Sequence, residues 1–363
     1  MKIIGSVKED LNIEKRISIT PEIVKKFVGL GFAVHIEEKY AEHLGIKDDD
    51  YKKSGANINF SKEEVFKKSD IILKVNCLSI DEVNLVKNKS ILVAQFDPNL
   101  NKDITNKLIK NGVKIFSLNL LPRITRAQSM DVLSSQANLA GYKAVIESFS
   151  NFEKAIPMMM TAAGTVPAAK VLIIGAGVAG LQAIATAKRM GAIVFATDVR
   201  STAKEQVESL GGKFLTVEGS ENLESETGYA KEASADFKKK QEDLLSETLK
   251  KIDIVICTAL IPGKKAPLII KENMINNMKA GSLIYDLAAV QGGNAAFTEV
   301  DKIVDKNGVK IMGERNILNK LPVSASNLYA KNLFNFVSNF YDKENKEISI
   351  NLNDEIIKKT LIE

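Results

Sequence analysis

A short apolar run that ends in a three-glycine motif constrains the fold of this 363-residue chain more than any other feature. Residues 170–174 (KVLII) have the composition of a buried strand, and Gly175, Gly177 and Gly180 follow them at the start of an apolar helical pattern. In that context the first glycine permits a tight turn, the second lets a ligand approach the backbone, and the third lets helix and strand pack closely. The start of such a helix also offers unpaired N–H groups to phosphates. The segment therefore predicts a dinucleotide-binding unit.

Short β-branched runs alternate with helical patterns along most of the chain. Two long helical patterns, about Ser134 to Phe152 and about Ser326 to Tyr341, stand apart from this alternation. The strand-like runs are residues 2–8, 33–38, 71–75, 90–96 and 113–119, then 170–177, 192–198, 253–260 and 281–288. Such alternation is typical of parallel, doubly wound sheets. We therefore expect an α/β protein with two doubly wound Rossmann-like domains, mainly parallel sheets, and long helices that link them.

The length of the chain suits two domains rather than one. The last helical pattern is expected to pack back on the first domain. We expect a discontinuous N-terminal domain of residues 1–133 and about 320–363, with the nucleotide-binding domain, residues 134–319, inserted.

Composition excludes several classes of protein. The chain is 45% hydrophobic and 26% charged, which is typical of a soluble globular protein. A net charge of +5, from 50 basic and 45 acidic residues, gives no reason to expect a nucleic-acid partner. The longest apolar stretch, residues 171–187, is shorter than the roughly 20 residues of a membrane span. We expect no membrane segment, no metal site and a cytoplasmic location.

A carboxylate at the end of the next strand refines the choice of cofactor. Asp198 ends the run 192–198, where it can bond the ribose hydroxyls of adenosine and would repel a 2′-phosphate. That favours NAD(H) over NADP(H). Arg200 is the opposing signal, because an arginine can accommodate the phosphate. Val178, Ala179 and Val199 lie between these residues and complete the candidate cofactor-binding set.

Two polar segments are candidate ligand contacts. In residues 123–143, amides and hydroxyls share one face on helical spacing, with Asp131 among them: Gln128, Asp131, Ser135 and Asn138. Such groups suit a partly enclosed ligand site or, alternatively, a polar helix at a domain interface. Residues 218–241 contain few apolar residues and are long for an α/β connection, which indicates a lid or an idle insertion.

Together these segments resemble the NAD(H)-binding component of proton-translocating transhydrogenases, in the alanine dehydrogenase/transhydrogenase family. The resemblance rests on RAQSMDVLSSQANLAGYKAV, PMMMTAAGTVPAAKVLIIGAGVAGLQAIATAKRMGA, TDVR and KEQVESLGGKF. It extends from KEDLNIEKRISITPEIV through TALIPGKKAP to SNLYAKNLFNF, which is nearly the whole chain.

The resemblance implies roles for individual residues. Arg123, Gln128 and Asp131 match a loop that fixes the dihydronicotinamide, with Ser134 completing the set. In this loop Arg123 pairs with Asp131, while Gln128 contacts the nicotinamide ribose and steers the ring. Gly228, Tyr229 and Gln241 match a mobile lid. Leu260 matches a position that lines the adenine side of the bound nucleotide.

The resemblance also implies an assembly. Hydride passes directly from NADH on this chain to NADP+ on a partner subunit, and a membrane-spanning subunit couples the reaction to proton translocation. NADP(H) binds only on the partner. The chain is expected to be a homodimer at the inner face of the plasma membrane, held there by its partner subunits.

Two other functions are considered. An NAD-dependent alanine dehydrogenase needs cations for the substrate carboxylate and a histidine for proton transfer. Arg16 and Lys74 could be the cations, but the two histidines, His35 and His43, stand in structural contexts, and residues 95–98 (QFDP) provide no proton donor. A non-catalytic NAD-sensing module would share the glycine motif but would not need the Arg-Gln-Asp segment.

Overall fold

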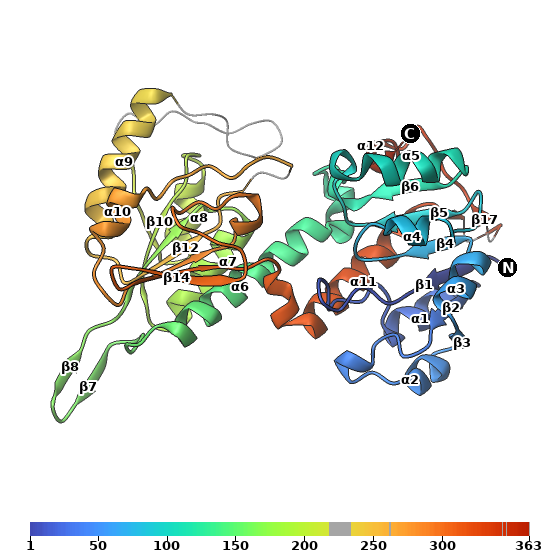
Figure 1. Ribbon diagram of the computed structural model, residues 1–363, viewed down its shortest axis with the longest axis horizontal. Helices are drawn as coiled ribbons and strands as arrows, with labels where there is room; N and C mark the ends of the chain where they lie inside the picture. The colour runs from blue at the N-terminus through green and yellow to red at the C-terminus, as the bar shows by residue number, and fades with distance from the viewer. Residues whose placement is uncertain (218–233, 261–262, 343, 346, 363) are drawn as a thin grey trace. The chain divides into compact units, whose positions relative to one another are not determined.

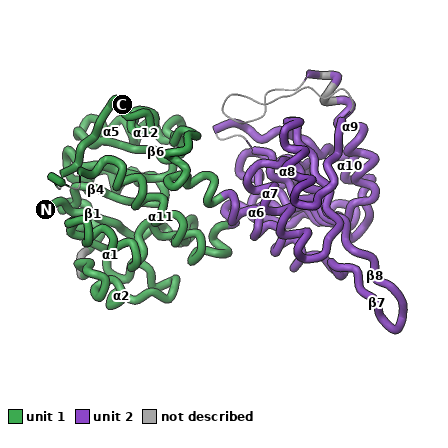
Figure 2. The backbone as a smooth tube through the Cα atoms, turned by 180° about the vertical axis from the view of Figure 1, so that it is seen from behind, with its two compact units in different colours: residues 1–136, 318–363 green, residues 137–317 purple. Residues whose placement is uncertain are grey.

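The polypeptide divides into two compact units (Figure 2). Unit 1 comprises residues 1–136 and 318–363, and unit 2 comprises residues 137–317. The structure is a computed structural model that describes residues 1–217, 234–260, 263–342, 344–345 and 347–362.

Unit 1 is built on a seven-stranded sheet with the order β18-β6-β5-β4-β1-β2-β3. Its strands are β1 (Ile3–Ser6), β2 (Ala33–Glu37), β3 (Asn57–Phe60), β4 (Ile71–Leu73), β5 (Ile91–Ala94), β6 (Lys114–Ser117) and β18 (Leu361–Ile362). Neighbouring strands are parallel except for β18, which runs antiparallel to β6.

Helices cover both faces of this sheet, as the alternation of strand side chains requires. Ile71 and Leu73 share one buried cluster with residues of α1, α2, α11 and α12, whereas Ile72 shares another with residues of α3, α4 and α5. The bounds of these helices are α1 (Pro21–Gly29), α2 (Asp48–Lys53), α3 (Lys62–Lys68), α4 (Ile80–Val83), α5 (Lys102–Lys110), α11 (Pro322–Asn339) and α12 (Glu355–Thr360). A short ribbon of β16 (Tyr341–Asp342) and β17 (Glu347–Ile348) lies between α11 and α12 in the chain.

Unit 2 has its own seven-stranded sheet, with the order β11-β10-β9-β12-β13-β15-β14. Its strands are β9 (Lys170–Ile174), β10 (Ile193–Thr197), β11 (Lys213–Phe214), β12 (Ile254–Cys257), β13 (Leu283–Asp286), β14 (Lys302–Lys306) and β15 (Val309–Gly313). All pairs are parallel except β14 with β15. The chain leaves β9 towards β10 and later returns to its other side as β12. The winding reverses there, and ligands of such sheets bind outside the carboxyl ends at that switch point.

The helices of unit 2 are α7 (Val178–Arg189), α8 (Ala203–Ser209), α9 (Ala235–Leu249) and α10 (Glu272–Asn276). α9 and α10 cover one face of the sheet, and α7 packs against β9 and β10. The long helix α6 (Val132–Asn151) begins in unit 1 and continues in unit 2. A hairpin of β7 (Met159–Thr161) and β8 (Gly164–Val166) projects from the body of unit 2 (Figure 1).

The predicted fold class is confirmed: both sheets are mainly parallel and Rossmann-like. Several strands of the two sheets went unpredicted, namely β3, β11, β14, β15 and β18. The edge strand β14 is mostly exposed, so its sequence lacks the buried run that marks a central strand. None of the helices in the described part of the chain combines the length and apolar character needed to cross a bilayer.

Candidate functional site

The glycine motif forms a tight turn between β9 and α7. Gly175 has a φ of +90°, which side chains rarely adopt, and a Cβ there would lie 2.8 Å from Thr258 Oγ1. Gly180 lies in the first turn of α7, where a Cβ would lie 1.8 Å from the carbonyl oxygen of Gly175. The fold itself requires these two glycines, because any side chain would collide with protein atoms.

Gly177 behaves differently. It is the N-cap residue of α7, with φ −76° and ψ −167°. Apart from its chain neighbours, no atom of the described residues lies within 4 Å of the position that a Cβ would take. An alanine would fit there without strain. The space lies beside the N-terminus of a twelve-residue helix, where backbone N–H groups have no partner within the helix. The residues present therefore fit a pyrophosphate that approaches the backbone at Gly177.

Asp198 directly follows β10, and its carboxylate is held on both sides. Oδ2 accepts the N–H of Ala176 in the glycine turn at 2.7 Å, and Oδ1 accepts the backbone N–H of Arg200 at 2.9 Å. The Arg200 guanidinium donates from Nε to Oδ1 at 2.9 Å and from Nη2 to Oδ2 at 2.8 Å. Burial disfavours the charged form, but these hydrogen bonds outweigh it and lower the pKa of Asp198. The group is a carboxylate at neutral pH.

The pair formed by Asp198 and Arg200 has a consequence for ribose binding. A carboxylate offers about four acceptor positions, and the contacts of Ala176 and Arg200 use them all. A ribose hydroxyl can therefore bond Asp198 only by displacing or sharing a bond from Arg200. Val199, between the two, packs in a small apolar cluster with Val217 and Leu244.

β12 ends beside the glycine turn. Thr258 Oγ1 lies 3.1 Å from the carbonyl oxygen of Ile174 and 2.9 Å from that of Gly175. Leu260, two residues further on, is 38% exposed at this edge of the sheet. Sequence reasoning singled out Leu260 but missed Thr258, because the contact of Thr258 joins residues more than eighty positions apart and leaves no local pattern.

The predicted lid lies only partly within the described residues. Gly228 and Tyr229 lie outside them, whereas Gln241 is half-buried on α9. The expectation that 218–241 is one irregular segment was wrong for its last part, because α9 begins at Ala235. Leu245 and Leu249, one helical turn apart, bury that helix in the core of unit 2.

The polar segment of unit 1 is not one continuous α-helix. Thr125–Met130 is a 3₁₀ helix, Asp131 has an extended backbone, and α6 begins at Val132. The prediction that Gln128 and Asp131 share an α-helical face with Ser135 was therefore wrong. Asp131 acts as an N-terminal cap instead: Oδ1 accepts the backbone N–H of Ser134 at 2.9 Å and Oδ2 accepts its hydroxyl at 2.5 Å.

The polar side chains before Asp131 are mostly exposed. Arg123 and Gln128 are exposed. Arg126 forms a bidentate ion pair with Asp354, with both N–O distances at 2.7 Å. Asp131 and Ser134 are thus brought together, while the pairing of Arg123 with Asp131 stays a prediction.

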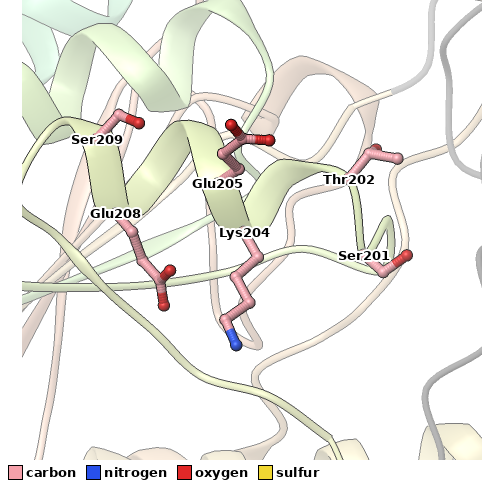
Figure 3. A pocket seen from close by; sticks show the side chains of 6 residues that line it. All are labelled: Ser201, Thr202, Lys204, Glu205, Glu208 and Ser209. Carbon is pink, nitrogen blue, oxygen red and sulfur yellow. The ribbon is translucent and has the colours of Figure 1, made fainter.

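A polar depression lies along α8, close in sequence to Asp198. It is lined by Ser201, Thr202, Lys204, Glu205, Glu208 and Ser209. The side chains of Lys204 and Glu208 point to one side of the helix and that of Glu205 to the other (Figure 3). Because the charged groups do not converge, we assign no ligand to this depression.

Comparisons with known proteins agree with this geometry. Residues 5–140 match the model of the alanine dehydrogenase/PNT N-terminal domain, and residues 144–363 match that of the C-terminal domain. The chain is 48% identical over 356 residues to the first part of NAD(P) transhydrogenase subunit alpha from Rhodospirillum rubrum, covering 96% of this chain and 93% of that protein. It is 45% identical to the protein of the same name from Rickettsia prowazekii, covering 100% and 94%.

The chain belongs to the alanine dehydrogenase/PNT family.

A solved structure supports the same conclusion. The transhydrogenase from Sinorhizobium meliloti superimposes with a TM-score of 0.89 at 44% identity, covering 99% of this chain and 98% of that one. Within the alanine dehydrogenase/PNT family, the likeness is thus to transhydrogenase alpha subunits, which are oxidoreductases.

The family also contains alanine dehydrogenases, whose chemistry would need free cations. In unit 1, Arg16 is buried and bound to Glu14, with its Nη2 2.7 Å from a carboxylate oxygen. Lys74 is buried between Glu9 and Glu82, at 3.5 and 3.1 Å. The two cations considered for a substrate carboxylate are therefore already paired with carboxylates of this chain.

The histidines do not change that conclusion. His35 lies on β2, where burial lowers its pKa. His43 is exposed, and its Nε2 lies 2.8 Å from the carbonyl oxygen of Lys15.

Proposed function

We propose that this chain is the NAD(H)-binding component of a proton-translocating transhydrogenase and exchanges hydride with NADP(H) on a partner subunit. The observation that carries the nucleotide assignment is Gly177. The fold needs Gly175 and Gly180, whereas the space beside Gly177 is free of described protein atoms and lies at the N-terminus of α7, which leaves room for a pyrophosphate. Family membership supports the transhydrogenase assignment.

At the adenosine end, Asp198 and Arg200 favour NAD(H) on this chain, with NADP(H) on the partner only. The carboxylate next to the glycine turn is charged at neutral pH and repels a 2′-phosphate. The guanidinium that could bind such a phosphate is committed to Asp198.

For the nicotinamide end, we propose roles for the segment from Arg123 to Ser134. Gln128 orients the ring, and Arg123 and Asp131 hold the loop. The two hydrogen bonds between Asp131 and Ser134 support a fixed loop, because they tie it to the first turn of α6. The remaining contacts that we propose are Gly228, Tyr229 and Gln241 in a lid, and Leu260 on the adenine side.

The chemistry requires little from the protein beyond position. When bound, the dihydronicotinamide itself supplies the hydride. Direct transfer between two rings needs no protein acid or base, so the residues of this chain act by binding, orienting and excluding water. Arg16, Lys74 and the two histidines have no role in the transfer.

We further propose a homodimer in a complex with a membrane-spanning subunit and an NADP(H)-binding subunit, at the inner face of the plasma membrane. Met158, Met159 and Met160 are 58, 41 and 84% exposed. They stand on and next to the projecting β7–β8 hairpin, and an apolar surface of this kind suits a second copy of the chain. The functional domains that we propose are residues 1–133 with about 320–363, and residues 134–319.

A reconstitution assay tests this function. The purified chain is mixed with a separately produced NADP(H)-binding domain of a transhydrogenase, NADP(H) and an NADH analogue whose absorbance differs from that of NADH. We expect rapid hydride exchange in the mixture and none with either protein alone.

The same preparation separates the alternatives. NADH formation from alanine and NAD+ by the chain alone would establish an alanine dehydrogenase and overturn the proposal. NADH binding without exchange in the mixture would indicate a sensing module instead.

A further inference from the structure

A chain of hydrogen bonds in unit 2 begins at the end of β13. Asp286 is fully buried, and its carboxylate accepts hydrogen bonds from the loop that follows it. The donors are the N–H groups of Ala288 (2.9 Å), Asn294 (2.7 Å) and Ala295 (3.0 Å) and the hydroxyl of Thr298 (2.7 Å). These bonds fix the position of Asn294.

Asn294 in turn fixes the segment after β12. Its side chain is fully buried, and Nδ2 donates to the carbonyl oxygens of Ala259 at 2.8 Å and Pro267 at 2.9 Å. Its Oδ1 accepts the N–H of Ala259 at 3.1 Å. The amide thus bonds Ala259 on both sides, as a neighbouring strand would, and leaves that residue little freedom.

Thr258, next to Ala259, makes the last step to the glycine turn. Its hydroxyl is within hydrogen-bond distance of the Ile174 and Gly175 carbonyl oxygens. It also lies 2.8 and 3.1 Å from the positions that Cβ atoms on Gly175 and Gly180 would take. One hydroxyl therefore packs against both glycines that the fold requires.

We propose that Thr258 is a positioning residue of the nucleotide site, held in place by Asn294. This inference rests on the proposed binding of NAD(H) to unit 2. From the β10 side the turn is held by the bond from Gly175 N–H to Thr197 O, 2.9 Å, and by that from Ala176 N–H to Asp198. From the β12 side it is held by the Thr258 hydroxyl. Thr258 sets the angle at which the first turn of α7 presents its N–H groups to the pyrophosphate.

The test compares NADH dissociation constants of full-length variants by fluorescence titration. Thr258→Val removes the hydroxyl with almost no change in shape, and we expect Kd to rise about tenfold, as for one lost hydrogen bond. Thr258→Ser keeps the hydroxyl and should stay within about threefold of the wild type. If Thr258→Val does not fold, Thr258→Ala takes its place, because it removes the hydroxyl without adding bulk.

Thr186→Val is the matched control. Thr186 is buried in α7, and its hydroxyl donates to the Gln182 carbonyl oxygen at 2.8 Å, away from the glycine turn. This variant also loses a threonine hydroxyl, but from the middle of α7 rather than from the segment after β12. Its melting temperature should fall comparably, while Kd stays within about twofold of the wild type. Asn294→Ala alone should raise the Kd for NADH. In the double variant Asn294→Ala/Thr258→Val, it should raise Kd little beyond the value for Thr258→Val, because both substitutions act through one contact.

The outcomes separate this inference from the proposed function. A Kd of Thr258→Val within twofold of the wild type, or an equal rise for Thr186→Val, overturns the positioning role. Fully additive effects of Asn294→Ala and Thr258→Val overturn the link between them. If the wild type binds no NADH, the nucleotide function itself fails, and the inference fails with it.

Discussion

Gly141 of α6 lies against the backbone of Ala179 in the first turn of α7. A Cβ on Gly141 would be 2.0 Å from the carbonyl oxygen of Ala179 and 2.7 Å from its carbonyl carbon. One turn earlier, Asn138 Nδ2 donates to Gln182 Oε1 at 3.2 Å. The part of α6 that lies in unit 2 is therefore fixed on α7, the helix that the glycine motif opens.

This contact predicts that Gly141→Ala is destabilising. The new methyl meets backbone atoms that cannot rotate away, so α6 must shift, and we expect a loss of about 1–3 kcal/mol in the free energy of unfolding. Gly29→Ala is the control, because Gly29 is also helical but has no atom within 4 Å of its Cβ position. It should be neutral or slightly stabilising. Equal unfolding curves for the two variants would show that α6 and α7 are not in close contact.

The glycine motif gives a second prediction: one glycine substitution should weaken NADH binding, and another should lower stability. Gly177→Ala should unfold like the wild type, since its methyl meets no atom of the described part of the chain, but should lose about tenfold or more in NADH affinity. Gly180→Ala should instead lower stability, because its methyl collides with the Gly175 carbonyl oxygen. Thermal unfolding and fluorescence titration of both variants measure this. Unchanged NADH affinity in Gly177→Ala would remove the main support for a pyrophosphate at this turn.

How much the sequence could predict depended on the range of the interactions involved. The β9–turn–α7 unit was predictable because strand, glycines and helix are adjacent in the chain and each residue has a local role. The start of α6 was not, because Asp131 fits a helical pattern equally well until its bonds to Ser134 show it to be a cap. Thr258 and Asn294 could not be found at all. Their partners lie in other segments of the chain, and no spacing in the sequence marks a hydroxyl that meets a distant carbonyl.

A third prediction concerns the choice between NADH and NADPH. Asp198→Ala removes the ribose acceptor and releases the Arg200 guanidinium that it binds. NADH binding should weaken by about 1.5–3 kcal/mol, as for a lost charge-assisted hydrogen bond, and NADPH binding should improve because a free arginine can bond the 2′-phosphate. The double variant Asp198→Ala/Arg200→Ala should lose that gain. Titration with both nucleotides decides it, and an unchanged preference in Asp198→Ala would contradict the proposed role.

A fourth prediction separates orientation from binding at Gln128. Gln128→Asn shortens the side chain by one methylene and keeps its amide, and a displacement of about 1 Å can reduce a rate roughly 100-fold. Hydride exchange in the reconstituted mixture should fall far more than NADH affinity does. Gln128 is exposed, so the substitution should leave stability unchanged. A parallel fall in rate and affinity would make Gln128 a binding residue only.

The last prediction concerns the buried charges of unit 1. The Glu9 side chain is 5% exposed and accepts the N–H of Val75 at 2.7 Å. Burial raises its pKa from 4.5 to about 7, because Lys74, 3.5 Å away and shared with Glu82, compensates only in part. Between these two values the folded chain holds a proton that the unfolded chain has lost. The contribution of Glu9 to stability therefore falls as pH rises from about 4.5 to 7 and is level above.

Glu9→Gln tests this, since glutamine stays neutral at every pH. The free energy of unfolding of the variant minus that of the wild type should rise between pH 5 and pH 8 by roughly 2–3 kcal/mol, at most 1.4 kcal/mol per pH unit. Glu22→Gln is the control. Glu22 is exposed, and its hydrogen bond with Lys26 lowers its pKa. The free energy of unfolding of Glu22→Gln minus that of the wild type should therefore not rise with pH. Urea unfolding followed by circular dichroism at four pH values gives both profiles. A difference for Glu9→Gln that is constant across this range would mean that Glu9 is already ionised at pH 5 and that Lys74 balances its burial.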